Sequence, residues 1–163
     1  MRFNWVDVLA IGAVASVAAV QLLRATRDFS QVFYETVFMV LAVVGAVRFF
    51  IPVSQRLNLN PALALGMLFV LLLVLGLLFA TFINQGLGFS LGGFDYLFGL
   101  LLGIVCGFVF GHALLRTIML ATMERHAEVV AAVRRSWMAS QVLYFGAFRE
   151  LLGILRIARY NNI

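Results

Sequence analysis

The chain consists of long apolar runs that are separated by short polar segments. No formal charge occurs between Arg56 and Asp95, and none occurs between Asp95 and Arg116. An apolar run of about 20 residues is long enough to cross a bilayer as a helix. We therefore expect four transmembrane helices: one that starts within residues 3–7 and ends near residue 23, and three over residues 36–50, 61–83 and 96–120.

Local signals mark several ends of these helices. Asn4 is followed three residues later by Asp7, which is an arrangement like a capping box. The pair Asn60-Pro61 places a capping residue before a proline in the first turn, as is typical of a helix start. Pro52 is expected to end the second helix.

The fourth predicted helix has a glycine at every fourth position. This spacing places the glycines along one side of the helix, although each costs about 1 kcal/mol relative to alanine. Such a stripe is typical of close approach by a second helix, but it is also compatible with a pore lining or a movable joint. The glycines are Gly99, Gly103, Gly107 and Gly111, and the small residues expected to admit a neighbour to the first helix are Gly12, Ser16 and Ala19.

An uncharged turn rich in glycine and serine, residues 86–94, precedes this stripe and includes Gly92 and Gly93. Asp95 stands where the turn becomes helix. Its carboxylate is expected to accept hydrogen bonds from the free N–H groups of the first turn, at the positive end of the helix dipole.

The link between the first two helices, residues 24–35, alternates charges with aromatic residues. One interpretation is a short helix that lies in the headgroup layer as an anchor. The other is a polar site that faces the helix bundle. In both, we expect Asp28 or Glu35 to pair with an arginine.

Three motifs in these segments resemble one family. The first motif is Gly-Gly-x-Asp-x-x-x-Gly-x-x-x-Gly-x-x-x-Gly, which consists of Gly92, Gly93, Asp95, Gly99, Gly103 and Gly107. Residues 4–7 read Asn-Trp-Val-Asp and include Trp5 and Asp7, and residues 32–35 read Val-Phe-Tyr-Glu and end at Glu35. Over roughly the first 120 residues the chain resembles the CvpA family of colicin V production proteins. The resemblance implies a bacterial inner-membrane protein involved in colicin V production or export and in envelope maintenance.

From residue 123 the pattern changes to an amphipathic, arginine-rich tail. Tyr144 and Phe148 fall on an apolar helical face, while Arg135, Arg149 and Arg156, spaced by multiples of seven, fall on another. This pattern is typical of a helix on a membrane surface and equally of a helix that docks on a partner protein. We therefore expect an all-α integral membrane protein, with a four-helix transmembrane domain (residues 1–122) and a helical tail (residues 123–163).

Composition agrees with a membrane protein. Of the 163 residues, 64% are hydrophobic, and the mean hydropathy is +1.05. The net charge is +5, with arginine as the basic residue throughout and no lysine. Because the arginines flank apolar runs, lipid phosphate and membrane topology explain them, and we expect no nucleic-acid partner. The positive-inside rule predicts that both termini lie in the cytoplasm.

Few residues suggest chemistry. His112 lies one turn from Arg116, and a histidine in a membrane helix is a candidate for a proton relay or a ligand. We expect no catalytic residues, no metal site and no cofactor, since no catalytic constellation and no second ligand at a suitable spacing are found. We expect the single cysteine, Cys106, to be a small packing residue.

An alternative function is a non-catalytic accessory or scaffold subunit of a larger membrane complex. It is suggested by the tail and by Tyr96 and Cys106, which stand where the family commonly has arginine. The expected partners are the lipid bilayer and either another membrane protein or further copies of this chain.

Overall fold

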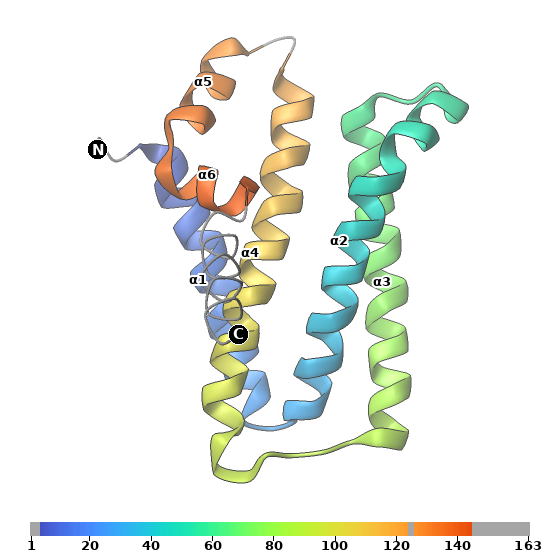
Figure 1. The fold of residues 1–163 in the computed structure, drawn as a ribbon, viewed down its shortest axis with the longest axis vertical. Helices are drawn as coiled ribbons and strands as arrows, with labels where there is room; N and C mark the ends of the chain where they lie inside the picture. Colours follow the sequence, from blue (N-terminus) through green and yellow to red (C-terminus); the bar gives the residue numbers. More distant parts are fainter. Residues whose placement is uncertain (1–3, 124–125, 145–163) are drawn as a thin grey trace, which may run out of the picture.

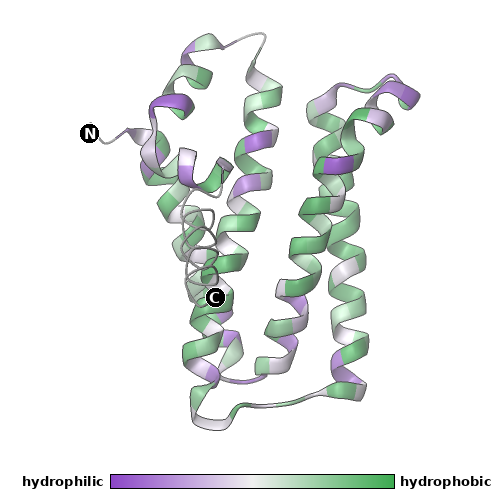
Figure 2. Ribbon diagram, in the orientation of Figure 1, coloured by the Kyte–Doolittle hydropathy of each residue, from purple (hydrophilic) through white to green (hydrophobic). Residues whose placement is uncertain are grey.

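The computed structural model describes residues 4–123 and 126–144, and every regular element in that part of the chain is helical. Four helices are long and apolar enough to cross a membrane, which confirms the expected all-α multi-pass architecture. Figure 2 shows apolar residues along these helices and hydrophilic ones mainly toward their ends. In chain order the elements are α1 (Trp5–Ala25), α2 (Phe29–Leu57), α3 (Pro61–Leu87), the short 3₁₀ turn η1 (Gly92–Phe94), α4 (Asp95–Thr122), α5 (Ala127–Arg135) and α6 (Trp137–Tyr144) (Figure 1).

The long helices form two pairs. α1 packs along α4, and α2 packs along α3, while α2 and α4 bring the pairs together (Figure 1). One apolar core lies among α2, α3 and α4 around Leu65 and Cys106. A second core joins α1 and α4 to α5 and α6 around Val133 and Val142. The described part of the tail therefore folds back onto the first pair.

α2 is longer than the sequence suggests. It begins at Phe29, directly after Asp28, whose side chain accepts a hydrogen bond from the N–H of Gln31 at 3.0 Å. It then continues through Pro52, so the expected stop at this proline is wrong. The helix ends instead where Asn58 adopts a left-handed conformation with φ of 50°, which asparagine tolerates better than most residues.

The predicted starts of α1 and α3 are confirmed. The side chain of Asn60 accepts from the N–H of Ala62 at 2.8 Å, with Pro61 in the first turn of α3. The N–H of Asn4 donates to the carboxylate of Asp7 at 2.9 Å, as expected for a capping box at the start of α1. These caps satisfy backbone groups that have no partner within the helix itself.

Candidate functional site

The glycine stripe of α4 is the surface on which α1 lies. A Cβ added to Gly103 would lie 2.9 Å from the Cα and the carbonyl oxygen of Ala18, and one added to Gly107 would lie 2.7 Å from the carbonyl oxygen of Val14. At Gly99 an added Cβ would collide with the side chain of Ala25. These contacts are those of a helix-packing seam, because backbone approaches backbone with no room for a side chain.

The fourth glycine of the stripe meets the tail. A Cβ added to Gly111 would lie 3.2 Å from Cγ1 of Val142 in α6. The stripe therefore accommodates two separate elements, α1 over three glycines and α6 over the last.

α1 meets this seam with a different face from the expected one. Its buried face includes Asp7, Val14 and Gln21, which are spaced by seven and so lie on one line. Because the side chains of Asp7 and Gln21 point into the bundle, the opposite face of α1 points away from it. The expected packing residues Gly12, Ser16 and Ala19 are consequently exposed.

Asp7 joins the start of α1 to the tail. Its side chain is buried, with 3% of the residue exposed. One oxygen, Oδ1, accepts hydrogen bonds from the hydroxyl of Ser136 at 2.6 Å and from the N–H of Met138 at 2.9 Å. The hydroxyl oxygen of Ser136 in turn accepts from the N–H of Ala139 at 2.9 Å. Asp7 and Ser136 thus cap the N-terminus of α6 together.

Glu35 pairs with an arginine, as expected. The Arg24 guanidinium donates to both carboxylate oxygens of Glu35, each at 2.6 Å, which is the bidentate geometry of a strong charge-assisted contact. Gln31 adds a third donor at 2.7 Å. The Glu35 side chain is 4% exposed, so it faces the bundle.

Of the two interpretations of residues 24–35, the structure therefore supports the polar site that faces the helix bundle. The interfacial helix is wrong because residues from Phe29 onward are the first turns of α2.

Asp28 ties the start of α2 to the end of α3. Its carboxylate accepts from the side-chain amide of Asn84 at 2.7 Å and from the hydroxyl of Ser30 at 3.0 Å. Partial burial opposes ionisation, but hydrogen bonds from Gln31, Asn84 and Ser30, together with the charge of Arg24, lower the pKa of Asp28 below its ordinary value. No local signal in the sequence indicates the contact with Asn84, since the two residues are 56 positions apart.

Asp95 stabilises the turn before α4 rather than the helix after it. Its carboxylate accepts from the hydroxyl of Ser90 and from the N–H of Leu91, both at 2.6 Å. The expected hydrogen bonds to the first turn of α4 are therefore wrong. Gly92 has φ of +66°, a backbone conformation that favours glycine. Gly92 and Gly93 are both exposed.

The polar residues in the middle of the bundle are mostly partnered. Gln21 donates to Sγ of Cys106 at 3.8 Å, and the Cys106 thiol donates to the hydroxyl of Thr36 at 3.3 Å. Nδ1 of His112 contacts the carbonyl oxygen of Val142 at 3.2 Å, which links α4 to α6. Within residues 4–123 and 126–144, no three histidine, cysteine or acidic residues are grouped to hold a metal ion.

The tail residues singled out from the sequence divide into two sets. Arg135 and Tyr144 lie at the ends of α5 and α6, and both are exposed. Phe148, Arg149 and Arg156 lie outside the described residues. Trp5, at the start of α1, is 54% exposed, as suits an interfacial aromatic residue.

No family model, no curated protein and no solved structure matches this chain.

Proposed function

We propose that the protein is a small, non-catalytic protein of a bacterial inner membrane, with the role implied by its resemblance to the CvpA family. That role is the production or export of a bacteriocin such as colicin V, together with maintenance of the cell envelope. The observation that supports it is a convergence of the motif residues on α1. Asp7 belongs to α1, Glu35 binds Arg24 of α1, and the first three glycines of the α4 stripe contact α1.

The physical cost of these residues makes the convergence informative. Carboxylates in membrane helices are rare and expensive, and they are mostly found where a protein uses them. Glycines in a helix interior also cost stability. Both kinds of residue here fix the position of one helix against the rest of the bundle, so we place the active part of the protein in the α1–α4 pair.

A complementation experiment tests this proposal. In a strain lacking the gene, we would measure bacteriocin export and resistance of the envelope to detergent, then restore the wild type, Gly103→Leu or Gly86→Leu. Gly86 is the matched control, because a Cβ there meets nothing within 4 Å. We expect the wild type and the control to restore both properties, and Gly103→Leu to fail at equal membrane abundance. A deletion strain with normal export and a normal envelope would refute the proposal.

The second candidate is the accessory subunit of a larger membrane complex, and the outward face of α1 favours it. Gly12, Ser16 and Ala19 are exposed on that face. Small residues allow a second membrane helix to approach closely. A groove of about 520 Å³ beside them, lined in part by Leu9, Leu114 and Ile118, could receive larger side chains of a neighbour.

Gentle extraction from the native membrane separates the two candidates. Native sizing and mass spectrometry would show whether the chain travels in a defined assembly with other proteins. If it does, the double variant Gly12→Leu/Ser16→Leu should leave the assembly, whereas Ala121→Leu, at an exposed position of α4, should remain in it. Recovery of the chain alone, or as a small homo-oligomer, would exclude the accessory role.

A further inference from the structure

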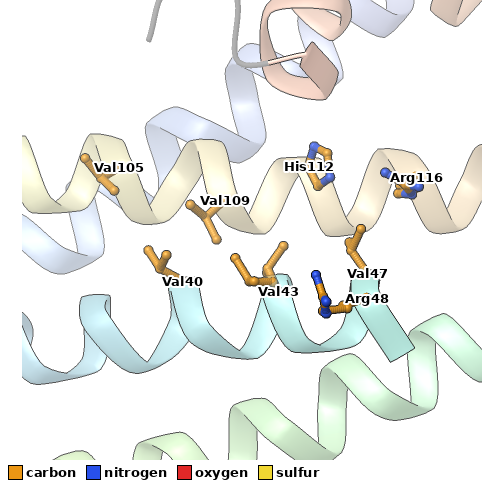
Figure 3. A pocket seen from close by; sticks show the side chains of 9 residues that line it. Val40, Val43, Val47, Arg48, Val105, Val109, His112 and Arg116 are labelled. Atoms are coloured by element: carbon orange, nitrogen blue, oxygen red, sulfur yellow. The ribbon is translucent and has the colours of Figure 1, made fainter. Parts of the chain in front are cut away.

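A groove of about 670 Å³ opens between α2 and α4, where the two helix pairs meet (Figure 3). This volume lies within the range of about 300–1,000 Å³ that is typical of small-molecule sites. Arg48 of α2 and Arg116 of α4 approach the same end of the groove from facing helices, beside His112 (Figure 3). Its walls are valines, namely Val40, Val43, Val44, Val47, Val105 and Val109.

The valine walls are stiff. A valine in a helix has one strongly preferred side-chain rotamer, so these walls do not rearrange easily to fill the space. Val43 and Val109 are also fixed from behind, since they belong to the core shared by α2, α3 and α4. Val44 is 58% exposed and forms the outer edge of the groove. The groove is thus largely formed before anything binds, which lowers the entropic cost of binding.

Both arginines line the groove, and within residues 4–123 and 126–144 neither has an acidic partner. Among the residues that the structure describes, no carboxylate forms an ion pair with Arg48 or Arg116. The Arg116 guanidinium lies over the ring of Phe50, with Cζ 5.7 Å from the ring centroid, which fixes it against α2. Within the described part of the chain, the end of the groove therefore carries two positive charges that no carboxylate neutralises.

The position of the arginines along the helices indicates the kind of anion. Arg48 lies nine residues before the end of α2, and Arg116 six residues before the end of α4, or about 14 Å and 9 Å along the axes. Both helices are longer than the roughly 20 residues that span the hydrocarbon layer. Arg48 lies 19 residues after the start of α2 and Arg116 lies 21 residues after the start of α4, or about 29 Å and 32 Å along the axes. With both starts at one face of the hydrocarbon layer, the guanidinium groups lie near its other face, and the valines extend from them toward the middle of the bilayer.

We propose that this groove binds an anionic glycerophospholipid, with its phosphate on Arg48 and Arg116 and one acyl chain along the valines. Arginine is well suited to the phosphate, because its guanidinium can donate two parallel hydrogen bonds. Basic pockets between transmembrane helices are typical sites for anionic lipid headgroups. A free phosphate would leave the valine surface unused, so the occupant is the lipid. This site is independent of the function proposed above, and α1 plays no part in it.

Native mass spectrometry of the full-length protein in detergent tests the proposal. The protein would be titrated with phosphatidylglycerol, whose net charge is −1, and with phosphatidylcholine of the same chain length, whose phosphate is offset by its choline ammonium so that its net charge is zero. We expect one tightly held lipid and a preference of at least tenfold for phosphatidylglycerol. Each arginine near a membrane surface contributes about 1 kcal/mol toward an anionic lipid, or about fivefold in affinity. Arg48→Gln/Arg116→Gln should therefore reduce the affinity for phosphatidylglycerol about 25-fold and that for phosphatidylcholine much less, so that the preference between the two lipids is largely lost.

A charge-matched control separates the effect of the two groove arginines from the effect of the protein's net charge. Arg27→Gln/Arg56→Gln removes the same charge from exposed positions that do not line the groove, and it should retain the preference. Val44→Trp should weaken both lipids by crowding the edge of the groove, and inorganic phosphate should not compete. Equal binding of the two lipids by the wild type, the same loss in the control pair, or displacement by inorganic phosphate would each overturn the proposal. Circular dichroism and native sizing of every variant would show that the fold is kept.

Discussion

The carboxylate of Asp7, in the first turn of α1, accepts a hydrogen bond of 2.6 Å from the hydroxyl of Ser136, which directly precedes α6. The two residues are 129 positions apart in the sequence. The same carboxylate oxygen accepts from the N–H of Met138, so a residue of the first membrane helix caps a helix of the tail. Residues 126–144 of the tail are therefore part of the folded body.

Replacement of Asp7 by alanine should loosen this part of the tail. The variant leaves the Ser136 hydroxyl and the Met138 N–H without their acceptor, and a buried donor that is left unsatisfied costs about 1–3 kcal/mol. We expect faster amide hydrogen exchange over residues 127–144, with unchanged exchange in α3. Asp95→Ala is the control, since it removes a carboxylate that contacts only its own turn. Equal protection of the tail in both variants would show that Asp7 does not hold it.

The Arg24–Glu35 contact should show energetic coupling in a double-mutant cycle. Arg24→Gln leaves Glu35, whose side chain is 4% exposed, without its counterion, so it should destabilise more than Glu35→Gln. The double variant should resemble Glu35→Gln, with a coupling free energy of about 1–2 kcal/mol. The measurement is the free energy of unfolding in detergent. Arg27→Gln, at an exposed position, should change little. Strictly additive effects of the two substitutions would mean that the contact contributes nothing.

Local patterns predicted much of this architecture. Run length alone indicates the four long helices, because a bilayer imposes a minimum apolar length. The start of α3 follows from Asn60 and Pro61, whose effects are confined to one helical turn. The pairing of Glu35 with an arginine follows from the cost of a buried charge in an apolar helix.

The sequence-based predictions fail where contacts between residues far apart in the sequence determine the local structure. Pro52 is a helix breaker by local rules, yet α2 continues through it, as membrane helices allow when neighbouring groups satisfy the freed backbone. The rotation of α1 depends on partners of Asp7 and Gln21 in other helices, and no property of α1 alone reveals them. The direction in which Asp95 reaches depends on the conformation of the turn before it.

Replacement of Gly103 by leucine should displace α1 from α4. The added Cβ would lie 2.9 Å from both the Cα and the carbonyl oxygen of Ala18, and backbone atoms in a helix cannot move aside cheaply. Overpacking of this kind costs about 1–3 kcal/mol. We expect a lower thermal unfolding temperature in detergent, with a smaller decrease for Gly103→Ala. Gly86→Leu is the control, because the space around Gly86 is open. If Gly103→Leu left the stability unchanged, the close packing of α1 on the glycine stripe would be contradicted.

Asp28 should make the contact between α2 and α3 sensitive to acid. Partial burial raises the pKa of its carboxyl, but the hydrogen bonds from Gln31, Asn84 and Ser30 outweigh this effect and lower the pKa below its ordinary value of 3.8. A carboxyl with a lowered pKa in the folded state stabilises the fold above its ordinary pKa, and the contribution is lost as the pH falls through the lowered value. The stability difference between the wild type and Asp28→Asn should therefore be constant between about pH 8 and pH 5, and should shrink below about pH 4. Denaturant unfolding at a series of pH values measures this difference. Asn84→Ala, which removes one of the donors, should move the loss to higher pH, whereas a difference that stays constant down to about pH 2 would show that Asp28 gains nothing from these contacts.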